Sequence, residues 1–141
     1  MPTYYRSDQA RIQVRVTGIA LDNVSWDVMQ GGDNVAPSTN YPPGGMQPSV
    51  ELGGTPRRNP LTVERIWSDT LVAAYKALDS GAGRLAATAT YTVLDANGNP
   101  VPNSSITYTG VLLETARPDY DSTSSNEAKL RLTIGLNGPI N

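Results

Sequence analysis

Alternation of apolar and polar residues constrains this 141-residue chain more than any other feature of its sequence. The segment 127–134 reads EAKLRLTI, and its apolar members occupy every second position: Ala128, Leu130, Leu132 and Ile134. The same pattern recurs near the start, where polar residues separate Ile12, Val14 and Val16. A repeat of two places one set of side chains on one face of a strand. Both segments are therefore predicted to be half-buried β-strands.

Further strands are predicted at 61–67, 85–94 and 105–115. The hairpin signal DANGNP joins the last two. A shorter strand is expected around Trp26, ending at two glycines. Thr, Ser, Gly, Pro and Asn are abundant and charged residues make up only 17%, a composition that favours strands and turns over helices.

One helix is predicted over 69–80. Ser68 is a suitable N-cap, and Asp69 places a carboxylate in the first turn, where the helix dipole stabilises it. Gly81 is the expected C′ residue. The helix carries one apolar face, formed by Leu71, Val72, Ala74, Tyr75 and Leu78, and Leu71, Tyr75 and Leu78 are predicted to face the β-core. The chain is thus expected to form one domain over 1–141, mainly β, with a β-sandwich or barrel-like sheet and this helix at its side.

A proline- and glycine-rich segment at about 30–48 has no periodicity. Because proline removes a ladder donor and fixes φ, no regular element is predicted there. The alternatives are a mobile surface loop and an arm, about 31–48, that docks on another subunit. The arm is favoured because proline lowers the entropy cost of ordering and because apolar residues lie within the segment. The candidate contact residues are Gly31, Gly32, Val35, Tyr41, Pro42, Pro43 and Met46.

The residue inventory argues against an enzyme. The sequence has no Cys and no His, which excludes thiol and imidazole catalysis and zinc sites built on those ligands. The run from Asp95 to Asn99 resembles the start of a calcium loop, but Pro100 and Ile106 stand where Gly and Glu are required. No catalytic residue, cofactor, metal or small-molecule substrate is therefore expected. A net charge of −2 argues against a dedicated nucleic-acid binder, and the apolar runs are too short to cross a membrane.

The order of these parts resembles the tail-tube proteins of tailed bacteriophages. The similarity lies in a succession that spans nearly the whole chain: RIQVRVTG, SWD before GGD, YPPGGMQPSVELGG, LTVERI before a helix, the DANGNP hairpin, and ARPDYD followed by AKLRLTIGLNG. The same superfamily includes the inner tubes of contractile tails and the ring protein of type VI secretion. The resemblance implies a barrel-like β-sandwich with a flanking helix.

The resemblance also implies a function. Copies would form six-fold rings that stack into a hollow tube, through which double-stranded genome DNA passes on ejection without specific binding. The implied partners are other copies, a tape-measure protein, a tail terminator and distal tail proteins. The implied location is the virion, in a phage tail assembled in the host bacterial cytoplasm. The alternative is a β-sandwich binding or adhesion module, which a stable monomer would favour.

Overall fold

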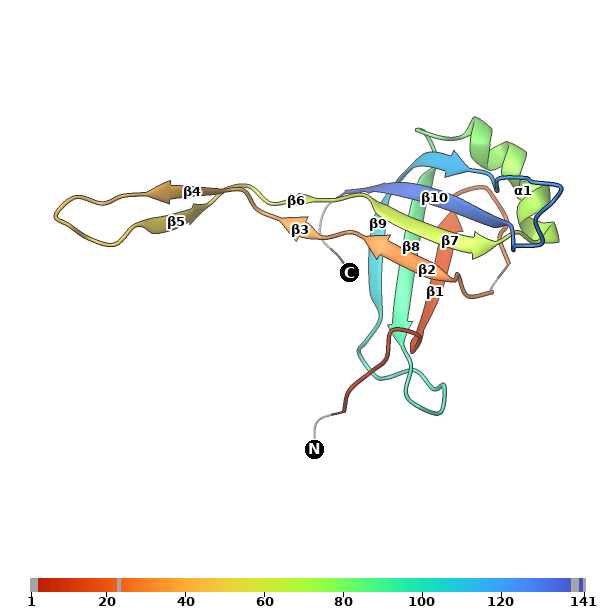
Figure 1. The fold of residues 1–141 in the computed structure, drawn as a ribbon, viewed down its shortest axis with the longest axis horizontal. Helices are drawn as coiled ribbons and strands as arrows, with labels where there is room; N and C mark the ends of the chain where they lie inside the picture. Colours follow the sequence, from red (N-terminus) through yellow and green to blue (C-terminus); the bar gives the residue numbers. More distant parts are fainter. Residues whose placement is uncertain (1–2, 23, 138–139, 141) are drawn as a thin grey trace.

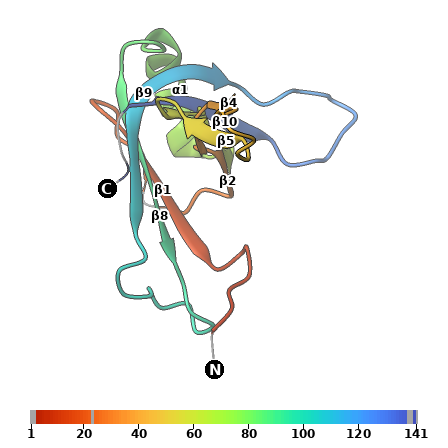
Figure 2. The same ribbon diagram turned by 90° about the vertical axis from the view of Figure 1, so that its left-hand side faces the viewer.

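The computed structural model describes residues 3–22, 24–137 and 140, and most of its strands belong to one curled sheet (Figure 1). This sheet has six antiparallel strands in the order β1-β8-β9-β10-β7-β2. They are β1 (Ala10–Val16), β2 (Val28–Gly31), β7 (Leu61–Ile66), β8 (Ala86–Val93), β9 (Ile106–Ala116) and β10 (Lys129–Leu136). Figure 2 shows the sheet curving into a half-barrel. The chain is therefore mainly β, and its sheet is barrel-like, as predicted.

The core lies on one face of this sheet, where the alternating apolar residues gather. Leu130, Leu132 and Ile134 are fully buried, and the alternation at 127–134 is confirmed for these three. Ala128 is half-buried and lies just before β10. The predicted pattern of β1 is also confirmed, because Ile12, Val14 and Val16 are buried. Other strands complete the core with Leu61, Val63, Ala87, Ala89 and Leu112.

Helix α1 (Asp69–Ser80) has the predicted bounds, and the Leu71 amide donates to Ser68 Oγ at 3.4 Å, as an N-cap requires. Leu71 and Leu78 are fully buried against the sheet, and Ala74 is buried between them. Tyr75 is half-buried, with its ring edge-on to Trp67 at a centroid distance of 5.6 Å. These contacts confirm that α1 covers the core.

Two details of the helix prediction are wrong. Val72 is half-exposed, because it lies beside the buried stripe and points away from the sheet. Gly81 is the C-cap, but its φ is −94°, so it does not adopt the left-handed conformation expected of C′. Its lack of a side chain matters for another reason: a Cβ there would overlap the side chain of Leu85.

The predicted strand around Trp26 is wrong in its position. Trp26 is buried in an irregular segment, and β2 begins only at Val28. The Trp26 amide donates to the Ile12 carbonyl of β1 at 2.9 Å, and the next amide, Asp27, donates to the Glu64 carbonyl of β7 at 2.9 Å. The segment therefore links the end strand β1 to β7, the neighbour of the other end strand β2. It pairs with each strand for one residue, which is too short for a strand.

The prolines and glycines at 30–48 do not prevent regular structure, so that prediction is also wrong. Two short antiparallel ladders extend the β2–β7 pair into an arm: β3 (Asn34–Val35) pairs with β6 (Arg57–Arg58), and β4 (Ser38–Tyr41) pairs with β5 (Val50–Gly53). The prolines fall between or beyond the ladders, where no donor is required. The arm is thus a long hairpin over residues 32–60, which extends well beyond the predicted segment.

Candidate assembly surfaces

The arm begins at two glycines whose backbone no other residue adopts easily. Gly31 and Gly32 have φ values of 88° and 77°, in the left-handed region that favours glycine. A Cβ at Gly31 would overlap the Pro60 carbonyl oxygen, and one at Gly32 would lie 3.2 Å from the Tyr108 ring. These two residues therefore allow the chain to leave the barrel while the arm stays packed at its base.

Arg58 fixes the base of the arm from the opposite strand. Its Nη1 donates to the Gly32 carbonyl at 2.9 Å, and its guanidinium carbon lies 5.8 Å from the centre of the Tyr108 ring. The Asn59 amide also donates to the Asp33 carbonyl at 2.8 Å. A cation over an aromatic face and a charged hydrogen bond together hold the departing arm in one direction.

Beyond its base, the arm projects away from the barrel (Figure 1). Every residue of β4 and β5 is exposed. At the tip, Met46 is fully exposed and has a φ of 62°. The arm also exposes about half of each of four other apolar side chains: Val35, Tyr41, Val50 and Leu52. Such a concentration of exposed apolar side chains on a thin hairpin is typical of a surface that contacts another molecule.

The structure arranges the seven predicted contact residues in sequence along this hairpin. Gly31 and Gly32 lie at the base and Val35 lies on the first ladder. Tyr41, Pro42, Pro43 and Met46 are gathered at the tip. Sequence reasoning missed Arg58, Val50 and Leu52. The spacing of Val50 and Leu52 on the far side of the proline-rich turn is the signal that could have identified the second strand.

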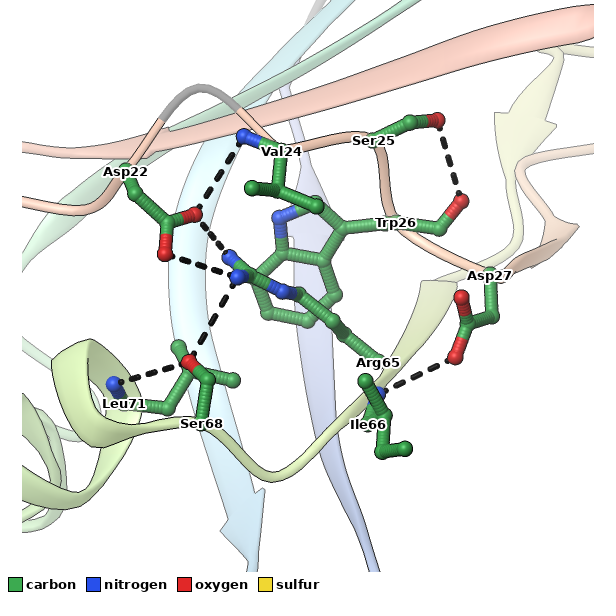
Figure 3. Close-up of polar contacts among 9 residues, drawn as sticks. All are labelled: Asp22, Val24, Ser25, Trp26, Asp27, Arg65, Ile66, Ser68 and Leu71. Atoms are coloured by element: carbon green, nitrogen blue, oxygen red, sulfur yellow. Dashed lines mark hydrogen bonds and ion pairs between the residues drawn. The ribbon is translucent and has the colours of Figure 1, made fainter.

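An ion pair between the buried Arg65 and the half-buried Asp22 positions the irregular segment that precedes β2, called the closing segment below (Figure 3). Arg65, on the core side of β7, is 2% exposed, and both ends of its guanidinium donate to the Asp22 carboxylate, with Nη2 2.7 Å from Oδ2. The hydrogen bonds from Arg65 hold the pKa of Asp22 below its ordinary value. Arg65 Nη2 also lies 3.4 Å from the N-cap oxygen of Ser68. One guanidinium thus connects β7, the start of α1 and the closing segment.

The face of the sheet opposite the core is rich in hydroxyl groups. Thr90 and Thr107 share a hydrogen bond of 3.0 Å between β8 and β9, and Thr92 and Ser105 share one of 2.9 Å. These pairs satisfy one another across the strands. The face therefore presents a polar surface that carries few fixed charges in this region.

Charged groups on the same face are partly paired. Arg131 Nε lies 3.5 Å from Glu64, and Lys129 Nζ lies 3.7 Å from Glu127. On β1, Arg11 and Arg15 are exposed between the buried residues of the strand. Glu64 and Glu127 thus offset the charges of Arg131 and Lys129 on β10.

Within residues 3–22, 24–137 and 140, no cluster of three or more acidic, Cys or His residues is placed to hold a metal ion. In the same part of the chain, no helix has the length and apolar character needed to cross a membrane.

The sequence matches no family model and no curated protein, but its fold matches solved cryo-EM structures. A chain of the six-fold symmetrised baseplate of the anti-feeding prophage aligns with a TM-score of 0.71 at 16% identity, over 100% of this chain and 96% of its own. A chain of the extended sheath–tube complex of PVC, an extracellular contractile injection system, aligns with a TM-score of 0.66 at 12% identity. The alignment covers 98% of this chain and 90% of that one. A chain of the PVC sheath/tube terminator aligns with a TM-score of 0.70 at 12% identity, over 99% of this chain and 96% of its own. The chain therefore has a phage tail-tube-like fold.

Proposed function

We propose that this chain is a structural subunit that assembles into stacked six-membered rings and so forms the hollow tube of a tail-like particle. The observation that carries the proposal is the arm, whose apolar residues are exposed and whose outer ladder projects away from the barrel (Figure 1). A two-stranded ribbon is only marginally stable in water by itself. We therefore expect the arm to be stabilised by burial against another molecule, and we propose that this molecule is a second copy of the chain.

The energetics of such a contact suit a repeating assembly. Burying one side chain such as Tyr41 or Met46 contributes about 1.5–3 kcal/mol. A single contact of this size gives weak association after the entropy cost of binding is met. Repeated around a ring, the same contact stabilises stacking many times over. Gly31, Gly32, Val35, Pro42 and Pro43 are proposed to set the direction and rigidity of the arm.

The particle is proposed to be a phage tail or a related injection device. The matching chains come from baseplate, sheath–tube and terminator structures, so other tail proteins are the expected partners: a tape-measure protein, a terminator and distal tail proteins. The role is structural and not catalytic. Assembly would take place in the host bacterial cytoplasm and leave the protein in the virion or particle, with no membrane or small-molecule partner.

Passage of genome DNA through the tube is the most detailed part of the proposal. A conduit must not bind phosphate strongly. The sheet face opposite the core is rich in hydroxyl groups, and acids lie beside its Arg131 and Lys129. A lumen lined by this face is compatible with weak phosphate binding. Two exposed arginines on β1, Arg11 and Arg15, share this face. DNA passage therefore requires both to lie at contacts between copies, and it is contradicted if the assembled lumen displays them.

Sedimentation velocity over a concentration series tests the proposal. The expected result is a monomer at low concentration that gives way to rings and longer species as concentration rises. A monomer that persists at high concentration, and also in the presence of tail proteins, would contradict the tube. That result would favour a monomeric binding or adhesion module instead.

A further inference from the structure

A groove separates the two end strands of the curled sheet. Its volume is about 520 Å³, with β1 on one side and β2 on the other. The Ser25–Asp27 segment bridges these strands at one point, where the Trp26 amide donates to the Ile12 carbonyl. Apart from this bridge, no strand of the described chain spans the gap between the free edges of β1 and β2. The groove is thus the part of the barrel that the chain leaves open.

The lining of the groove combines apolar side chains with polar ones, Ser7 and Gln30 among them, and is nearly uncharged. Ala10 and Ile12 line it from β1, and Met29 and Gly31 from β2. Tyr91 and Tyr108 also line it, with ring centroids 6.4 Å apart. Asp27 is the one charged residue of the lining, and its Oδ2 already accepts the Ile66 amide at 3.0 Å. An anionic occupant would find no basic side chain in the groove and would lose its hydration, and a cationic one would find only Asp27.

We propose that this groove receives the tip of the arm, residues 41–48, from a second copy of the chain. This inference rests on the proposed function and identifies the surface that the arm contacts. The arm has no charged residue between Asp33 and Glu51, so its uncharged tip suits the nearly uncharged groove. Tyr41 and Met46 supply exposed apolar side chains of the kinds that are enriched at the centres of interfaces.

The geometry of one chain explains why the contact is between copies and why it repeats. The arm projects away from the barrel, so its tip does not lie at the groove of its own chain (Figure 1). The tip and the groove are different surfaces, and each copy carries one of each. A heterologous contact that does not close into a ring leaves a free tip at one end and a free groove at the other. It therefore propagates, as stacking into a tube requires.

Disulfide trapping tests the contact directly, because the chain contains no cysteine that would interfere. The test variant combines Met46→Cys with Ala10→Cys, and the matched control combines Met46→Cys with Val72→Cys, a half-exposed position on α1. A disulfide requires the two Cα atoms to approach within about 7 Å. Mild oxidation of the assembled protein is expected to give a ladder of covalent multimers for the test variant alone, and reductant should abolish it.

The outcomes separate this inference from the proposed function. If tubes form but the test variant gives no ladder, or the control gives the same ladder, the groove is not the receiving surface, although the tube proposal stands. If the unmodified chain forms no rings or tubes, both proposals are wrong.

A groove-filling substitution gives a second test. Ala10→Trp should raise the concentration needed for assembly at least about tenfold, whereas Val72→Trp should leave it unchanged. Circular dichroism confirms the fold of each variant. A folded Ala10→Trp protein that assembles at the unmodified concentration would overturn the inference. If Ala10→Trp does not fold, the disulfide test decides.

Discussion

The guanidinium group of Arg65 is buried against the carboxylate of Asp22, which lies 43 residues earlier in the chain. This pair joins β7 to the irregular segment that leads from β1 to β2. Charges in such a place are costly to leave without a partner, because water no longer solvates them. The shape of the half-barrel therefore depends on an interaction that its apolar pattern does not reveal.

Asp22→Asn should lower the free energy of unfolding by about 3–5 kcal/mol, because it leaves Arg65 buried without a counter-ion. Replacing both residues, with Arg65→Met added, should restore part of that loss. Urea unfolding of the single and double variants measures both effects. The control is Asp8→Asn, which breaks the exposed pair between Arg6 and Asp8 and should cost no more than about 1 kcal/mol. Equal effects of Asp22→Asn and Asp8→Asn would contradict the role assigned to the buried pair.

The same pair predicts a loss of stability in acid. Arg65 holds the pKa of Asp22 below its ordinary value in the folded protein, so the folded state binds this proton less readily than the unfolded state. The stabilisation is complete above the ordinary carboxyl pKa, about 4, and is lost as pH falls through the lower folded value. Unfolding curves of the unmodified chain and Asp22→Asn should therefore converge below about pH 4. A constant difference over this range would count against the prediction.

Leu78→Ala should destabilise the fold by about 2–5 kcal/mol, because Leu78 is fully buried between α1 and the sheet. Val72→Ala, on the exposed side of the same helix, should change stability by no more than about 0.5 kcal/mol. Thermal or urea unfolding of the two variants compares them directly. An unchanged midpoint for Leu78→Ala would show that the helix is not part of the core.

Gly110→Ala should also destabilise the sheet. A Cβ at this position would overlap the Gly135 backbone carbonyl across the β9–β10 ladder, and overpacking of this kind costs about 1–3 kcal/mol. Gly53→Ala is the matched control, since no atom lies within 4 Å of its added Cβ. Chemical unfolding of both variants measures the difference. Similar midpoints would mean that the strands separate there at little cost.

The sequence predicted the elements whose apolar residues face one core. Helix 69–80 and the strands at 61–66 and 86–93 were found within a residue or two, because burial on one side imposes a period. The arm was predicted as an assembly element but not as a hairpin. Both faces of β4 and β5 are exposed, so burial imposes no alternation on β4, and only the short Val50–Glu51–Leu52 alternation marks β5.

The remaining site residues depend on contacts between distant segments. Arg65 continues the alternation of Leu61 and Val63 on the core side of β7, but nothing in the spacing identifies Asp22 as its partner. No pattern in the sequence assigns a role to Arg58, and its contact with Tyr108 arises only when the base of the arm packs on β9. Such pairs depend on the topology of the sheet. The apolar–polar alternation of a strand predicts which face is buried, but not which distant residue it will contact.

Electron microscopy of an arm variant tests the central claim most directly. Residues 36–46 are replaced by a short Gly/Ser linker, and circular dichroism is measured on the same sample. The account predicts a folded β-barrel that no longer forms long tubes, while the unmodified chain forms them. Full-length tubes from the variant would contradict the claim that the arm holds the rings together, and an unfolded variant would show that the arm belongs to the core of its own subunit.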